Sequence, residues 1–406
     1  MPKRFIREHS VAGHAVADRN DQLRPFRVMK VMQRAMELEA QGRHIIHMEV
    51  GEPDFITPQP VIDAACVAMA AGKTGYTDAA GIPSLRQAIS DHYLSRHNLA
   101  IPPRRIFITP GGSGGLNLLA NLLIQRDDGV LMADPGYPCN PNFVRLAGGE
   151  PQFVPVNAKG NFQPEPAALE ASRRSNTRGV WLASPANPTG AVIPRNALKT
   201  IVQWCREREM HLLVDEIYHG LHYVDDLPTV LALDDQSFVV NSFSKYFGMT
   251  GWRLGWIVVP ESRIQQVEIL MQNMFICASS ISQHAALAAF QSETLSILNQ
   301  RRQAFRERRD YLVVALRDIG FEVSDVQGAF YVYAGIGKFA DDSEKFCETM
   351  LAEHGVAITP GTDFGTHLAD THVRFAFTTS LENLQQAIER LRHALRRHGP
   401  DPAERP

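Results

Sequence analysis

Apolar and polar positions follow two different rhythms through the middle of the chain. Short runs rich in β-branched residues predict strands, and the longer stretches between them have the apolar spacing of amphipathic helices. The predicted strands are residues 106–109, 130–133, 151–154, 179–182, 211–214, 238–240 and 254–259, and the predicted helices lie near 114–125, 138–147, 165–173 and 195–208. This alternation predicts an α/β fold in which helices cover both faces of a mostly parallel sheet.

The flanks of this central part have a different pattern. From Arg24 the apolar positions predict an amphipathic helix, which is followed by a short extended run at 45–50. After Pro260, long helical patterns and then a mixture of strands and helices predict a smaller α+β domain, joined at its base by the N-terminal segment. We therefore expect an N-terminal arm (1–23), a small domain (24–50 plus 300–397), a large domain (51–299) and a tail (398–406).

Composition limits the class of protein. The chain has 406 residues, of which 44% are hydrophobic and 21% charged, as in soluble globular proteins. A formal net charge of -3 gives no electrostatic reason to expect a nucleic-acid or membrane partner. The start of the chain lacks the pattern of a signal peptide, and the five cysteines are scattered. We therefore expect a cytoplasmic protein with reduced thiols.

Two histidine pairs could at first suggest a metal site. His44 and His47, and likewise His219 and His222, lie three positions apart. Neither pair has cysteine or carboxylate partners at ligand spacing, so we interpret them as helix-face or core residues and expect no metal.

The most specific pattern is the run Ser242-Phe243-Ser244-Lys245, with Arg253 eight positions further on. Asp215 ends an apolar run upstream of it. A lysine that can bond to an aldehyde, an aspartate for a ring nitrogen and a cationic cradle for a phosphate are what a pyridoxal-phosphate enzyme requires. In these motifs the chain resembles the class I and II aminotransferases, which belong to the fold-type I pyridoxal-phosphate superfamily.

The resemblance implies a role for each residue around the cofactor ring. Lys245 would bond to the cofactor and, once displaced by substrate, move the proton of the substrate α-carbon. Asp215 would pair with the protonated ring nitrogen, and Tyr218 would hydrogen-bond the phenolic oxygen. Tyr137, in the run Asp134-Pro135-Gly136-Tyr137, would stack on the ring face.

The cofactor phosphate needs several donors. A glycine-rich run at 111–115 lies between a predicted strand and a predicted helix, and we expect a loop there whose amides face an anion. By resemblance, Gly112 and Ser113 contact the phosphate, and Ser242 and Arg253 complete the cradle.

The substrate contacts come from other segments. By resemblance, Arg374 in the apolar run 373–377 would bind the substrate α-carboxylate in a two-bond fork. Asn187 would contact both the cofactor phenolate and this carboxylate, and the backbone of Gly51 would approach the carboxylate. Tyr76 matches the tyrosine that reaches the phosphate of a neighbouring subunit, which implies a homodimer with shared active sites.

These features together predict an aminotransferase that works in two half-reactions on an amino acid and a 2-oxo acid. Ser113 stands where a lysine can bind the distal carboxylate of acidic substrates, so we expect neutral or aromatic donors. Aspartate aminotransferase activity and a C–S or β-eliminating lyase remain alternatives. A cofactor-sensing regulator would need an attached DNA-binding module, for which the segment before Arg24 leaves no room.

Overall fold

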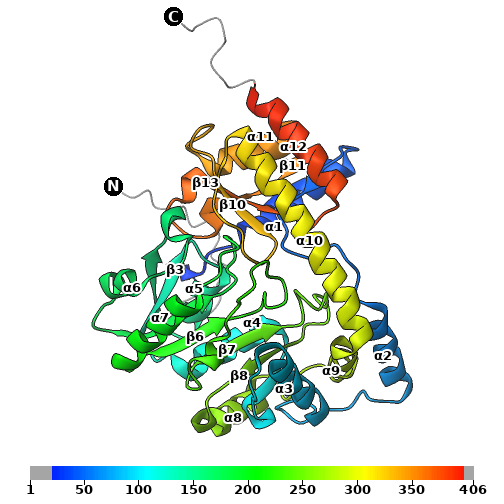
Figure 1. The fold of residues 1–406 in the computed structure, drawn as a ribbon, viewed down its shortest axis with the longest axis vertical. Coiled ribbons are helices and arrows are strands. Elements are labelled where there is room, and N and C mark those ends of the chain that lie inside the picture. Colours follow the sequence, from blue (N-terminus) through cyan, green and yellow to red (C-terminus); the bar gives the residue numbers. More distant parts are fainter. Residues whose placement is uncertain (1–20, 397–406) are drawn as a thin grey trace, which may run out of the picture.

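A mostly parallel sheet lies at the centre of the computed structural model, which describes residues 21–396 (Figure 1). Within this range its seven strands are ordered β2-β8-β7-β6-β5-β3-β4. Their bounds are β2 (Ile106–Thr109), β3 (Gly129–Asp134), β4 (Glu150–Pro155), β5 (Thr177–Ala183), β6 (His211–Asp215), β7 (Phe238–Ser242) and β8 (Gly255–Val258). Strands β3 to β7 pair in parallel, whereas β8 is antiparallel to β2 and β7. The predicted α/β fold is confirmed.

Helices cover both faces of this sheet and divide the core into two layers. They are α3 (Pro83–His97), α4 (Gly111–Leu123), α5 (Cys139–Leu146), α6 (Pro166–Ser172), α7 (Arg195–Glu207) and α8 (Ile264–Met274). Leu212 and Val214 of β6 pack with α3, α6 and α7, whereas Leu213 between them packs with α4, α5 and α8. Successive strand residues point to opposite faces, and both faces are covered, so the strands are continuously apolar.

The glycine-rich run after β2 is not the predicted loop, because α4 already begins at Gly111. Glycine disfavours helices, but close packing decides the outcome here. A Cβ on Gly115 would lie 2.8 Å from Ile257 of β8, and one on Gly111 would lie 2.6 Å from the Arg253 guanidinium. The residues therefore form the first turns of α4, where backbone N–H groups lack helical partners.

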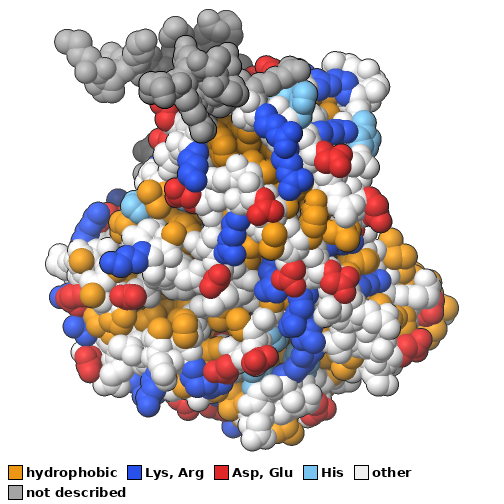
Figure 2. Space-filling model, turned by 45° about the horizontal axis from the view of Figure 1, so that its top comes forward, with side chains coloured by type: hydrophobic (Ala, Val, Ile, Leu, Met, Phe, Trp, Pro, Cys, Tyr) orange, Lys and Arg blue, Asp and Glu red, His pale blue; other side chains and the backbone are white. Residues whose placement is uncertain are grey.

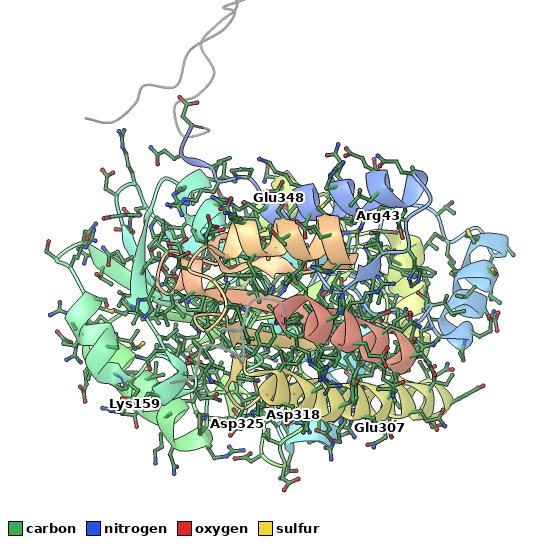
Figure 3. The ribbon with its side chains drawn as sticks, turned by 90° about the horizontal axis from the view of Figure 1, so that it is seen from above. Arg43, Lys159, Glu307, Asp318, Asp325 and Glu348 are labelled. Carbon is green, nitrogen blue, oxygen red and sulfur yellow. The ribbon has the colours of Figure 1, made fainter. Side chains whose placement is uncertain are left out.

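A second, antiparallel sheet lies beside the first and consists of β12 (Thr359–Pro360), β13 (His372–Ala376), β10 (Tyr331–Gly335) and β9 (Glu322–Val323). The helices around it are α1 (Arg27–Ala40), α10 (Ser292–Ile319), α11 (Ser343–His354) and α12 (Leu381–Arg396). Figure 3, seen from above, shows α11, α12 and α10 lying side by side at the top of the molecule. The N-terminal strand β1 (Ile46–His47) pairs in parallel with β11 (Val356–Ala357) and so joins this C-terminal part.

The remaining helices connect the two parts. Helix α2 (Gln59–Ala70) packs against α9 (Ser280–Leu287), and α10 continues without interruption through the expected boundary at residues 299 and 300. The domain division remains a proposal. The expected tail and most of the expected arm (residues 1–20) lie outside the described residues.

The surface is mixed in charge on the face shown in Figure 2, where basic and acidic side chains are interspersed. None of the helices in residues 21–396 is long and apolar enough to cross a membrane.

Candidate active site

The carboxyl ends of four parallel strands open onto one cavity of about 420 Å³. Tyr137 follows β3, Asn187 follows β5, and Asp215 and Ser242 end β6 and β7. Ligands of open parallel sheets bind at this edge. The predicted site residues that line the cavity are Gly51, Gly112, Ser113, Tyr137, Asn187, Asp215, Tyr218, Ser242, Lys245, Arg253 and Arg374.

Lys245 lies just after β7 and extends into this cavity. Its Nζ donates a hydrogen bond of 2.8 Å to the carbonyl oxygen of Gly51. Burial, followed by the nearby positive charge of Arg374, lowers the pKa of Lys245 to about 8. A lysine with such a pKa has a sizeable neutral fraction near neutral pH, so it can act as a nucleophile and accept a proton.

Asp215 is 4% exposed and its carboxylate accepts the N–H of Ile217 at 3.0 Å. Burial raises the pKa of Asp215 to about 7, against the lowering effects of that hydrogen bond and of Lys245. A carboxyl group buried in this way is costly to ionise unless a cation lies beside it. It therefore suits a ligand with a protonated ring nitrogen.

Donors for an anion gather at the N-terminus of α4. The amides of Gly112 and Ser113 belong to its first turn, and the hydroxyl group of Ser242 lies behind them at the end of β7. Arg253 has a positive φ of 52° and donates from Nη1 to the carbonyl oxygen of Thr250 at 2.9 Å. A helix N-terminus, a hydroxyl and a guanidinium form a set of donors that fits a phosphate.

Arg374 of β13 is 2% exposed and enters the cavity from the second sheet. Its guanidinium contacts two rings, 4.3 Å from the centroid of Tyr331 and 4.7 Å from that of Phe364. Nη1 donates to Asn187 Oδ1 at 3.0 Å, and Nη2 donates to the carbonyl oxygen of Glu49. Its Nε is buried without a partner in the described residues, so it remains available to a ligand carboxylate.

Asn187 is oriented by this contact. Because its Oδ1 accepts from Arg374, its amide NH₂ is free to donate to a ligand. Gly51 is required by close approach, since a Cβ there would lie 1.8 Å from the hydroxyl oxygen of Tyr331. That hydroxyl is in turn 3.0 Å from the hydroxyl of Tyr218.

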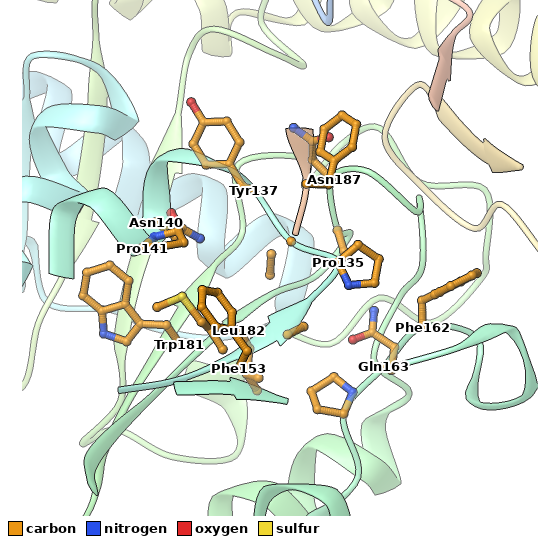
Figure 4. Close-up of a pocket in the computed structure, with 17 residues that line it drawn as sticks. Pro135, Tyr137, Asn140, Pro141, Phe153, Phe162, Gln163, Trp181, Leu182 and Asn187 are labelled. Carbon is orange, nitrogen blue, oxygen red and sulfur yellow. The ribbon is translucent and has the colours of Figure 1, made fainter. Parts of the chain in front are cut away.

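Tyr137 and Asn187 line both the main cavity and a smaller one of about 40 Å³. Figure 4 shows this second cavity, with Tyr137 and Asn187 on one side and Trp181, Leu182 and Phe153 on another. The Tyr137 ring is fixed from the other direction by an edge contact with Phe26, at 6.3 Å between centroids.

Tyr76 is the predicted site residue that the structure leaves apart. It is 84% exposed and does not line the cavity. The groups on the cavity walls nevertheless fit pyridoxal phosphate. The Asp215 carboxylate can accept from its protonated ring nitrogen, Lys245 suits its carbonyl, and the donors of the anion cradle suit its phosphate.

Several cavity residues were not predicted from the sequence. Tyr331 was seen only as part of an apolar strand, and Phe364 lies in a loop without a motif. Phe26, Met29 and Met32 supply an apolar wall from the start of α1. Their apolar pattern was visible, but the same pattern serves helices that only face a core.

Comparisons with known proteins agree with this geometry. The family model described as aminotransferase class I and II matches residues 43–391. The valine–pyruvate aminotransferase of Mycobacterium tuberculosis is 40% identical over 90% of this chain and 95% of its own length. The aspartate/prephenate aminotransferase of Thermus thermophilus is 34% identical over 92% and 97%. A solved aminotransferase structure from Mycobacterium tuberculosis has a TM-score of 0.92 at 38% identity, covering 95% of this chain and 100% of that one.

Replacing Asp215 by asparagine in the cofactor-free protein measures the cost of the buried carboxyl. Burial raises its folded-state pKa to about 7, so wild-type stability falls as pH rises from the unfolded-state pKa, about 4, to about 7. We expect D215N to exceed the wild type in free energy of unfolding by about 4 kcal/mol near pH 8 and by much less near pH 4. Urea unfolding at both pH values gives the difference.

The exposed Asp318 on α10 provides a matched control. D318N removes a carboxyl group from the surface and should not reproduce the large gain in stability expected of D215N near pH 8. If D215N gives no extra stability at the higher pH, Asp215 is already compensated inside the fold, and the argument for a cationic ligand group fails.

Proposed function

The chain belongs to the class I and II aminotransferase family, whose members use pyridoxal phosphate, and we propose that it moves an amino group from a neutral or aromatic L-amino acid to a 2-oxo acid. One observation carries the proposal most strongly. Lys245, Asp215 and Arg374, drawn from two sheets, line a single cavity. These are a base, a charge partner for a ring nitrogen and a receptor for a carboxylate.

Each part of the cofactor has residues suited to hold it. Lys245 would be its covalent anchor in the resting enzyme, and Asp215 would pair with the ring nitrogen. The anion cradle at the start of α4 would bind the phosphate together with Arg253. When bound, pyridoxal phosphate supplies an electron sink for the electron pair left at the substrate α-carbon.

Arg374 and Asn187 would bind and orient the substrate carboxylate. Both residues line the same cavity, and within the described part of the chain the Nε of Arg374 has no hydrogen-bond partner. A two-point grip fixes the direction of the α-carbon, which shortens the search for a reactive geometry. Both the amino acid and the 2-oxo acid carry this carboxylate, so one grip serves both half-reactions.

Lys245 would move the proton. Once substrate has displaced it from the cofactor, its amine can take the proton from the α-carbon and return it elsewhere. A pKa lowered to about 8 by burial supports this role, because the neutral amine is then accessible near physiological pH.

The walls of the cavity support a preference for neutral or aromatic donors. Its cationic groups within the described residues are Lys245, Arg253 and Arg374, each with a role above. Ser113 offers no positive charge to a distal carboxylate, and α1 adds an apolar wall. Of the relatives named above, one acts on valine and one on aspartate by name, so aspartate remains the second candidate donor, and a lyase side reaction the third alternative.

Lys245→Ala tests the assignment of the base. The wild-type protein with cofactor should show an absorbance band in the visible to near-ultraviolet that an amino-acid donor bleaches and a 2-oxo acid restores. K245A should bind the cofactor without a covalent bond and transfer no amino group. Lys199→Ala, at an exposed position on α7, is the control that should keep full activity. Full activity in K245A would overturn the proposal.

A panel of amino donors with one common 2-oxo acid tests the substrate class. We expect kcat/KM for neutral and aromatic donors to exceed that for aspartate, because each cavity cation among residues 21–396 already has another proposed role. Ser113→Lys should raise kcat/KM for aspartate selectively, whereas Ser113→Ala should not. A value for aspartate above those of all neutral donors in the unmodified protein would contradict the preference.

We also propose a homodimer in which Tyr76 contacts the cofactor phosphate of the partner subunit. Tyr76 is 84% exposed. The side chains of Val67 and Met69 on α2 are also exposed, at 68% and 52%. Helix α2 packs against α9, whose Ser280 donates to the carbonyl oxygen of Gly75, so these exposed groups lie in one region. Exposed apolar side chains gathered in this way support an interface.

Mixing two inactive variants tests shared sites. Tyr76→Ala chains and Lys245→Ala chains are prepared separately and then allowed to exchange subunits. A mixed dimer would contain one site with both defects and one site with neither, so transfer activity should reappear on mixing. If the mixture stays as inactive as its components while exchange is verified by mass, Tyr76 acts within its own chain.

A further inference from the structure

Asp134, the last residue of β3, has no role in the chemistry described above, but several hydrogen bonds hold its carboxylate. It is 2% exposed, and its carboxylate accepts hydrogen bonds from a distant segment. The N–H of Thr366 lies 3.1 Å from each of its two oxygens, the Thr366 hydroxyl lies 3.0 Å from Oδ2, and the N–H of His367 lies 3.2 Å from Oδ2. A buried carboxylate that receives several donors is held in one position.

The segment 361–367, called here the Phe364 loop, is shaped to approach this carboxylate. A Cβ on Gly365 would lie 1.7 Å from Asp134 Oδ1, so only glycine allows the contact. A second attachment follows directly, because the N–H of Gly136 donates to the carbonyl oxygen of Phe364 at 2.8 Å. The loop is therefore fixed to the end of β3 at Phe364 itself and at the residues that follow it.

Phe364 connects this attachment to the substrate site. Its ring is 3% exposed and lies 4.7 Å from the Arg374 guanidinium, which also contacts the ring of Tyr331 at 4.3 Å. Tyr331 is placed by the sheet and by its contact with Tyr218. The position of Phe364, in contrast, depends on a loop with two attachments. Asp134 holds the loop after Phe364, and before Phe364 the carboxylate of Asp363 accepts the N–H groups of Arg27 and Val28.

We propose that Asp134 is a positioning residue for carboxylate recognition. By fixing the Phe364 loop, Asp134 keeps the Phe364 ring against the Arg374 guanidinium. The ring in turn fixes the orientation of the guanidinium plane that is needed to bind a carboxylate. The inference rests on the proposed role of Arg374 and adds the residue that sets its geometry. A planar guanidinium binds a carboxylate through two bonds only when its plane is fixed.

Asp134→Asn is the primary variant, because the amide replaces one acceptor oxygen by a group that cannot accept the loop donors. We expect KM for the amino donor and for the 2-oxo acid to rise together by about tenfold, with kcat changed by less than about threefold. The cofactor absorbance band and cofactor affinity should be unchanged. Asp370→Asn, at an exposed position just after the loop, is the matched control and should change none of these values.

A double-mutant cycle separates a positioning role from general loss of structure. Arg374→Lys removes the planar group on which Phe364 lies, and it should by itself raise both KM values. In that background D134N should raise KM no further if Asp134 acts through Arg374. Additive effects, or a rise in KM for one substrate only, would overturn the inference.

Two further variants keep the inference testable if D134N does not fold. Thr366→Val removes the hydroxyl donor but keeps the backbone bonds, and Phe364→Leu removes the ring but keeps the loop. Both should raise the two KM values in parallel, with T366V the milder, and unchanged values would contradict the inference. If R374K leaves both KM values unchanged, the proposed role of Arg374 fails; if R374K raises them and D134N, T366V and F364L do not, only the role of Asp134 fails.

Discussion

Burial of ionisable side chains in one cavity is the constraint on which the rest of this site depends. An ionised group inside a protein costs free energy unless hydrogen bonds or opposite charges compensate it. Here Lys245 has one carbonyl oxygen and Asp215 one backbone N–H, while Arg374 has two aromatic rings and hydrogen bonds from Nη1 and Nη2 but none from Nε within the described residues. This incomplete compensation appears in the shifted pKa values of Lys245 and Asp215 and in the Nε of Arg374, which has no partner in the described residues.

Incomplete compensation of these charges also explains why the site suits a ligand with several charged groups. The parallel sheet supplies the lysine, the aspartate and the anion cradle, while the antiparallel sheet supplies the arginine. A molecule that pairs with all of them at once would repay the cost of burial in the folded, ligand-bound state. The stability that the ligand-free protein loses by burying these charges is therefore linked to its affinity for the ligand.

Close packing holds the two contributions in register. Gly51 brings its carbonyl oxygen to Lys245 because a side chain at that position would overlap Tyr331, and Tyr331 also covers Arg374. Arg374 also contacts Phe364, whose loop precedes β13 of the second sheet and is attached to Asp134 of the first. Aromatic rings, and Tyr331 above all, thus couple the position of Lys245 to the position of Arg374.

The sequence by itself determined the elements and the ligand chemistry. The apolar runs that end at Asp215 and precede Lys245 form buried strands. Such strands appear in the sequence as short, continuous runs of apolar residues and can be predicted from it. The order of Asp215, Ser242, Lys245 and Arg253 identified the cofactor chemistry because those residues lie close together in the chain. The glycine run was misassigned as a loop, since its helical form depends on contacts with β8.

Only the tertiary structure decided which distant residues meet. Gly51 and Lys245 are separated by 194 positions, and Asp134 and Thr366 by 232, so no local periodicity connects them. Tyr331 and Phe364 carry no motif, because their role arises from packing against Arg374 rather than from their own chemistry. Tyr76 remains a prediction for a related reason: a contact with a second subunit is not encoded in the folding of one chain.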